Sequence, residues 1–190
     1  MRRRLIALAC ALALVAGCTQ GDLETLAQRA VAGRRFEEAR GLYRRLAERD
    51  PDNDEYLVWI GRLSGWLEDF DTADVTYNVV LQRDSENVEA LVGKAYVATW
   101  QERFHDAQRL LRAAKRVAPR DPEVLLALAR CYRDEGRLSA ASRTVERLVV
   151  HDPDNAEGRE LRRTVSRVRP PESLLGRITR MWRCSACEPS

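Results

Sequence analysis

The chain has 190 residues, of which 45% are hydrophobic, 32% charged and 6% aromatic. It is therefore long and apolar enough to bury the core of one domain, and it is not a wholly disordered protein. The formal net charge of +3 comes entirely from Arg2, Arg3 and Arg4, because the other residues carry 29 basic and 29 acidic side chains. A balanced charge argues against a protein whose main task is to bind nucleic acid.

Residues 1–17 have the pattern of a cleaved export signal. Three arginines open the segment, and the apolar stretch from Leu5 to Ala16 is too short to cross a bilayer as a permanent helix. The four residues Val15-Ala16-Gly17-Cys18 resemble the bacterial lipobox, whose cysteine is lipidated and becomes the first residue of the mature chain. The resemblance predicts a lipoprotein with residues 18–20 as its anchor, and the alternative is a plain secretory signal with a chance cysteine.

The residue after Cys18 bears on the choice of membrane. In the enterobacterial sorting rule an aspartate at this place favours retention in the inner membrane, whereas this chain has Thr19. We therefore expect an envelope lipoprotein of the outer membrane that faces the periplasm, rather than one of the inner membrane. Several acyl chains on one cysteine make an effectively permanent anchor.

A period of 34 residues runs through the body of the chain, and four series of residues keep it in four copies without an insertion. The series are Pro51, Ser85, Pro119 and Pro153; Ala39, Ala73, Ala107 and Ala141; Phe36, Phe70, Phe104 and Leu138; and Ala27, Gly61, Ala95 and Ala129. The period and the residue types resemble the tetratricopeptide repeat. This resemblance implies an all-α fold, a right-handed solenoid of about four helical hairpins over residues 21–155, with repeats at about 20–53, 54–87, 88–121 and 122–155.

The register of the repeats predicts where the helices lie. First helices are expected near 21–33, 55–67, 89–101 and 123–135, and second helices near 36–49, 70–83, 104–117 and 138–151. The small residues let paired helices approach closely, and the prolines end the second helices. A capping segment, 156–169, is expected to add a ninth helix with a polar outer face. Lys94, Ser85 and the scarcity of glycine between helices, where only Gly136 fits, depart from the family pattern.

In this family the first helices line a concave groove that holds an extended peptide or a partner helix. Carried over repeat by repeat, the groove-facing residues are Val58, Trp59, Arg62, Trp66, Val92, Tyr96, Thr99, Trp100, Leu126, Arg130 and Arg133. Aromatic side chains beside arginines are typical of a binding hot spot, although Trp66 and Trp100 could instead pack on each other across one period. The family's lysine and asparagine clamp for a terminal carboxylate is absent, so an apolar or mixed peptide, or a helix, is the expected ligand.

Residues 170–190 form a basic tail. After Pro170-Pro171, the segment 173–183 (SLLGRITRMWR) has apolar residues at helical spacing with arginines on the other side. It is either a basic amphipathic helix that lies on an anionic leaflet or grips a partner, or a last helix folded back on the solenoid, or a frayed tail. Cys184 and Cys187 follow, and they are too few for a structural zinc site. An oxidising periplasm would favour a disulfide between them, although a bond across three residues constrains little.

Nothing in the sequence has the arrangement of a catalytic, metal or cofactor site. His105 and His151 are the only histidines, and neither has a catalytic constellation around it. The prediction is a membrane-anchored, non-catalytic protein-binding adaptor, similar to tetratricopeptide lipoproteins of the pilotin and Tad-pilus type, that assists assembly of a pilus or a secretion-system outer-membrane complex. The alternatives are a structural scaffold in polysaccharide export or cell-wall assembly and, more remotely, a thiol-disulfide enzyme that uses Cys184 and Cys187.

Overall fold

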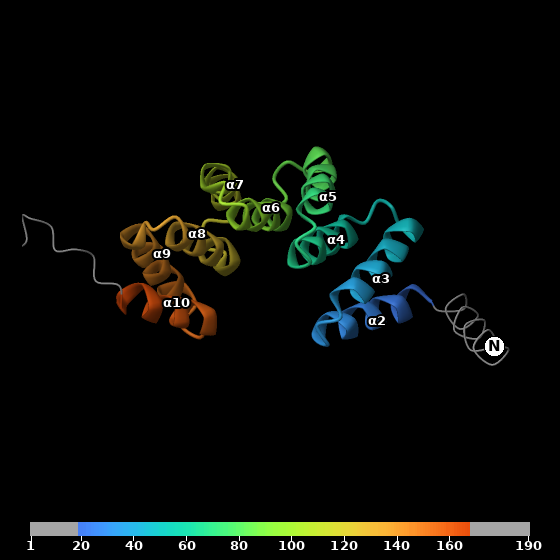
Figure 1. The fold of residues 1–190 in the computed structure, drawn as a ribbon, viewed down its shortest axis with the longest axis horizontal. Helices are drawn as coiled ribbons and strands as arrows, with labels where there is room; N and C mark the ends of the chain where they lie inside the picture. The colour runs from blue at the N-terminus through green and yellow to red at the C-terminus, as the bar shows by residue number, and fades with distance from the viewer. Residues whose placement is uncertain (1–18, 168–190) are drawn as a thin grey trace, which may run out of the picture. The chain divides into compact units, whose positions relative to one another are not determined.

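A computed structural model of the chain describes residues 19–167, and every regular element in that range is an α-helix (Figure 1). The helices are α2 (Gln20–Ala32), α3 (Phe36–Arg49), α4 (Asp54–Trp66), α5 (Phe70–Arg83), α6 (Val88–Trp100), α7 (Phe104–Val117), α8 (Pro122–Asp134), α9 (Leu138–His151) and α10 (Ala156–Arg167). The all-α hairpin solenoid is confirmed. The predicted second helices coincide with the observed ones, and the first helices begin and end one residue earlier than predicted.

Two compact units make up the structure, with the boundary between Val97 and Ala98. The first holds α2 to α5 and most of α6, and the second holds the end of α6 and α7 to α10. The signal segment, Cys18 and the tail 170–190 lie outside the described residues. Among residues 19–167, no helix combines the length and the apolar character that a membrane span requires.

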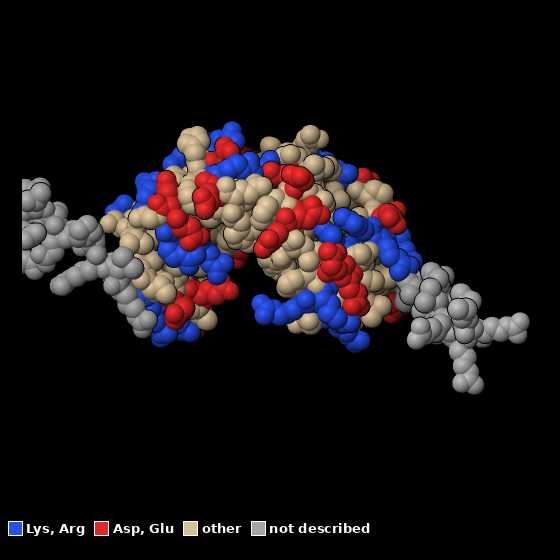
Figure 2. All heavy atoms as spheres, in the orientation of Figure 1, with Lys and Arg blue, Asp and Glu red and all other residues tan. Residues whose placement is uncertain are grey.

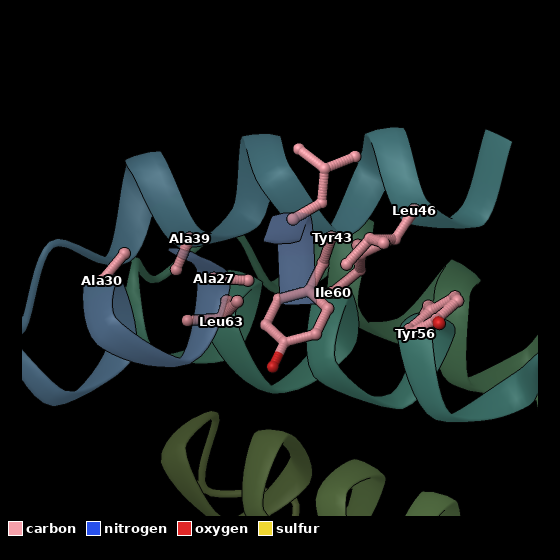
Figure 3. Packing of buried hydrophobic residues seen from close by; sticks show 9 residues of the cluster. Ala27, Ala30, Ala39, Tyr43, Leu46, Tyr56, Ile60 and Leu63 are labelled. Atoms are coloured by element: carbon pink, nitrogen blue, oxygen red, sulfur yellow. The ribbon is translucent and has the colours of Figure 1, made fainter. Parts of the chain in front are cut away.

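The core of the first unit begins where α2, α3 and α4 meet. Leu23, Ala27, Leu46 and Leu63 are fully buried there, and Figure 3 shows side chains of all three helices converging on this cluster. The predicted small residues Ala27 and Ala39 belong to this core, and both are fully buried. Burial of these apolar side chains stabilises the hairpin pair, because a single hairpin cannot cover its own apolar faces.

A second cluster of the first unit surrounds Tyr77 of α5. Its ring lies against Gly61 of α4, where a Cβ atom would come within 2.8 Å of the ring carbons. The Tyr77 hydroxyl lies against Gly93 of α6, where a Cβ atom would overlap it. Glycine at both positions therefore makes room for one large, fully buried side chain.

The second unit has its own core between α8, α9 and α10. Leu125, Ala129, Val145, Leu148 and Leu161 are buried in it. The capping helix α10 contributes Leu161 to this core and leaves its remaining faces polar, as expected for the last helix of a repeat array.

Most of the helix starts are fixed by side chains that accept backbone hydrogen bonds. Thr19 and Asp22 form a reciprocal capping box at α2, and Asn53 caps α4. Asp69 caps α5, and Asp121 caps α8 just before Pro122. These side chains satisfy the backbone N–H groups that the first turn of a helix leaves without partners.

Candidate protein-binding surface

A stripe of four side chains runs along α4, and we call Glu55, Trp59, Arg62 and Trp66 the α4 stripe. Their spacing of four, three and four residues places them on one side of a helix with 3.6 residues per turn. Trp66 is 41% exposed, Glu55 is exposed, and Trp59 and Arg62 are half-buried. The stripe thus begins with a carboxylate, continues through an aromatic ring and a guanidinium, and ends with an exposed indole.

The middle of the stripe is held by stacking. The Trp59 ring lies parallel to the Tyr43 ring of α3, with centroids 5.3 Å apart and an interplanar angle of 7°. The Arg62 guanidinium lies over the same indole, 4.9 Å from its centroid. Stacking and cation–π contact both favour this arrangement and restrict the indole to one orientation.

The end of the stripe packs on the preceding repeat. The Trp66 ring lies 5.1 Å from the Phe36 ring, centroid to centroid, with a tilt of 45°. Phe36 starts α3, and its ring restricts the orientation of the indole, which remains 41% exposed. An exposed, oriented tryptophan is a typical anchor for a protein partner.

Carboxylates surround the stack. The Tyr56 hydroxyl donates a hydrogen bond to the Glu24 carboxylate, which places that acid beside α4. Burial raises the pKa of Tyr43 to about 12, with further contributions from the charges of Glu55 and Glu24. Burial also raises the pKa of Tyr77, and the charge of Glu89 adds to that effect. Glu24 and Glu55 are therefore close enough to the stack for their charges to act on it.

The structure corrects four of the predicted groove residues. Val58, Val92, Thr99 and Leu126 are buried and do not line an open surface. Val58 packs with Ala73 and Tyr77, and Leu126 belongs to the core of the second unit. Each first helix packs against neighbours on more than one side, so positions assigned to the groove by register alone include core positions.

In the second unit the predicted arginines are paired with acids. Arg130 of α8 donates to Glu157 of α10 at 2.6 Å, and Arg133 donates to the adjacent Asp134 at 2.7 Å. Trp100 is 45% exposed, and Tyr96 of the first unit is half-buried. Trp59, Arg62, Trp66, Tyr96, Trp100, Arg130 and Arg133 thus remain as surface candidates, each within its own unit.

Sequence reasoning missed Tyr43 and Glu24, which complete the surface around α4. Tyr43 lies one period before Tyr77, a signal that marks a repeat position and not a contact with Trp59. Within residues 19–167, Cys131 is fully buried and burial raises the pKa of its thiol, and no group of three His, Cys, Asp or Glu side chains there could hold a metal ion.

Comparison with protein families finds two matched segments. Models described as tetratricopeptide repeat match residues 24–64 and 98–164, which together span more than half of the chain. No curated protein sequence matches the chain. The matched segments cover the α4 stripe up to Arg62, as well as the core of the second unit.

Solved structures share the fold. TTC0263, a thermophilic TPR protein of Thermus thermophilus, is 20% identical with a TM-score of 0.71 over 77% of this chain and 81% of that one. Pseudomonas aeruginosa pilF is 17% identical with a TM-score of 0.65 over 77% of this chain and 67% of that one. YrrB, described as a TPR protein with an unusual peptide-binding site, is 12% identical with a TM-score of 0.59 over 76% of this chain and 75% of that one.

Proposed function

The chain belongs to the tetratricopeptide repeat family, and on that premise we propose that it is a non-catalytic adaptor that binds a protein partner through its first helices. In this proposal a lipid on Cys18 anchors it to the envelope, facing the periplasm, and it assists assembly of a pilus or a secretion-system outer-membrane complex. The observation that carries the binding role is the exposed, oriented Trp66 at the end of the α4 stripe.

Physical reasons support this surface over the rest of the molecule. Stacking of Trp59 on Tyr43 and the tilted contact of Trp66 with Phe36 order the two indoles before any partner arrives, so little side-chain entropy remains to be lost on binding. Large aromatic anchors in fixed orientations supply much of the free energy of protein association. The peptide-binding site of YrrB, a protein of the same fold, is consistent with this use of the fold.

The envelope part of the proposal has separate support. The lipobox resemblance at Val15-Ala16-Gly17-Cys18 favours a lipid anchor, and Thr19 favours the outer membrane. The presence of a protein named pilF among the structures with this fold favours a pilus over other envelope machines.

Photo-crosslinking in the native host tests the binding role. A benzoylphenylalanine residue replaces Trp66 in one strain and Trp100 in another, and the captured protein is identified by mass spectrometry. Val150 of α9, which is 75% exposed and lies on a second helix, gives the matched control. We expect one component of an envelope assembly to be captured from Trp66 or Trp100 and not from Val150. Equal capture from all three positions, or none from any, would contradict the proposal.

Fractionation tests the anchor. The substitution Cys18→Ser removes the only acceptor for the lipid in the lipobox, so we expect the chain to move from the outer-membrane fraction to the soluble periplasmic fraction. Cys10→Ser, a cysteine within the signal segment, is the control and should leave the distribution unchanged.

A further inference from the structure

The first unit carries an excess of acid that the whole-chain charge conceals. Residues 19–97 include 16 acidic and 10 basic side chains, whereas residues 98–167 include 11 acidic and 15 basic ones. Figure 2 shows acidic and basic side chains interspersed over the face that it displays, so the excess must be located residue by residue. The aromatic α4 stripe lies within the acidic unit.

Two carboxylates and one guanidinium set the charge around the stripe. Glu24 and Glu55 act on Tyr43, and Arg62 acts on it with the opposite sign. Glu55 is exposed, Glu24 accepts a hydrogen bond from the Tyr56 hydroxyl, and the Arg62 guanidinium lies over the Trp59 indole. The net charge around the exposed part of the stripe is therefore negative, and its acids are open to a cation from outside the unit.

The order of the side chains along α4 gives the stripe two chemically different ends. Glu55 and Trp66 are eleven residues apart, which corresponds to about 16 Å along a helix. The acid marks one end of the stripe, and the exposed indole with Phe36 beneath it marks the other. A ligand that matches both ends must place a positive group and an apolar group about that far apart, as a helix of about eleven residues or an extended segment of about five does.

We propose that the α4 stripe binds a cationic amphipathic segment of the partner protein, with an arginine or lysine at the Glu55 end and a leucine or aromatic side chain at the Trp66 end. This inference rests on the proposed binding function and names the chemistry of its partner. Charge complementarity selects the partner and speeds its approach, while the two indoles provide the apolar contact. An acidic segment is repelled by Glu24 and Glu55.

Binding of two synthetic peptides tests the inference on the purified full chain. The peptide RLLRALLRALW is eleven residues long and carries three arginines, and ELLEALLEALW replaces each arginine with glutamate. By fluorescence anisotropy we expect the arginine peptide to bind at least about tenfold more tightly than the glutamate peptide. Raising the salt concentration should weaken the binding of the arginine peptide only, because salt screens the attraction between exposed charges, over about 10 Å at 0.1 M salt.

A matched pair of variants locates the effect. Glu24→Gln with Glu55→Gln should weaken binding of the arginine peptide about fivefold, since the loss of two interactions worth about 0.5 kcal/mol each, about 1 kcal/mol in all, raises the dissociation constant roughly fivefold. Glu48→Gln with Glu86→Gln removes the same charge from exposed positions outside the stripe and should change the affinity little. Circular dichroism checks that all variants keep their helix content.

The outcomes separate this inference from the proposed function. Equal affinity for the two peptides would overturn the proposed charge selectivity. An equal loss of affinity for the arginine peptide in the two pairs of variants would overturn it as well. Capture from Trp66 in the host of a partner whose crosslinked segment is acidic would also overturn it and leave the adaptor role standing. Selective peptide binding without any capture in the host would support the selectivity and contradict the adaptor role.

Discussion

Four residues that lie one period apart, Arg34, Glu68, Glu102 and Gly136, form the turns inside the hairpins. Their φ angles are 57°, 60°, 60° and 83°, all in the left-handed region. A residue with a Cβ atom adopts this conformation at a cost of about 1–2 kcal/mol, whereas glycine adopts it freely. The sequence shows that only one turn has glycine, and the structure shows that the other three keep the same strained conformation without it.

Glycine should therefore stabilise the turns that lack it. We expect Glu68→Gly and Glu102→Gly each to raise the free energy of unfolding by about 0.5–1 kcal/mol, because relief of the left-handed strain exceeds the extra entropy of an unfolded glycine. Both side chains are exposed, so little else is lost. Urea unfolding measures the change. Gly136→Ala is the reverse control and should lower stability by about 1 kcal/mol; a stabilising effect there would refute the reasoning.

The contact between Gly93 and Tyr77 leads to a second prediction at the scale of single residues. A Cβ atom on residue 93 would overlap the Tyr77 hydroxyl, so Gly93→Ala should destabilise the first unit by about 1–3 kcal/mol. Tyr77→Phe removes the hydroxyl but leaves two ring carbons within 2.7 Å of that Cβ atom, so it should restore little of the loss in the double variant, as a urea-unfolding cycle will measure.

Gly61→Ala provides the control for that cycle. Its added Cβ would meet the ring carbons of Tyr77 at 2.8 Å, and those carbons remain in phenylalanine. Tyr77→Phe should therefore rescue neither Gly61→Ala nor Gly93→Ala. Rescue of Gly93→Ala alone would show instead that the hydroxyl is the obstacle there.

At the scale of elements, polar side chains connect the second helices α3 and α7 to the turn that precedes the following second helix. Arg40 of α3 is only 12% exposed and donates to Asp69, ahead of α5, at 2.7 Å. The corresponding residues of the second unit are Gln108 of α7 and Arg137, ahead of α9, and Arg137 donates to the Gln108 amide oxygen at 3.2 Å. The two pairs occupy equivalent positions of the repeat. In the first pair the donor lies on the second helix, and in the second pair the donor lies in the turn.

Asp69 makes this connection sensitive to acid. Its hydrogen bond with Thr72 lowers the pKa of the carboxyl, and Arg40 lowers it further. A carboxyl with a lowered pKa in the folded state stabilises the fold at pH values above its ordinary pKa near 3.8, and that stabilisation is lost as the pH falls below it. Wild-type stability should thus decline on acidification from about pH 5 to about pH 3 partly through this group.

Asp69→Asn should consequently show a smaller decline over the same pH range, because asparagine still caps α5 but does not titrate. Urea midpoints at the two ends of that range measure the difference between variant and wild type. Asp71→Asn removes an exposed aspartate two residues later, outside this connection, as the control. An identical acid dependence of wild type and Asp69→Asn would show that the carboxyl does not contribute.

The helices and the surface around α4 were predictable to different degrees. The period fixes helix positions because every repeat must place its small and large residues at the same helix crossings, as Ala27 and Ala39 do. Exposure is not periodic in the same way. Val58 has the register of a surface residue and lies in the core, while Tyr43 stacks on Trp59 across sixteen residues that no repeat spacing signals.

At the scale of the whole molecule, the two units have separate cores built from equivalent residues. Leu46 in the first repeat and Leu148 in the fourth are three periods apart, and both are fully buried in their own clusters. In a repeat protein each element contacts only its neighbours, so stability is a sum of local contributions. A defect in one core need not be transmitted to the other.

Hydrogen exchange of two matched variants measures how far a defect spreads. Leu46→Ala and Leu148→Ala each remove the same buried side chain and should cost about 2–5 kcal/mol where they act. We expect Leu148→Ala to accelerate amide exchange in α8, α9 and α10 while α2 and α3 keep wild-type protection, and Leu46→Ala to do the converse. The reason is that opening of one core leaves the apolar contacts of the other buried. Uniform acceleration in both units by either variant would show instead that the chain unfolds as one cooperative body, and a partner bound at the α4 stripe would then stabilise both cores equally.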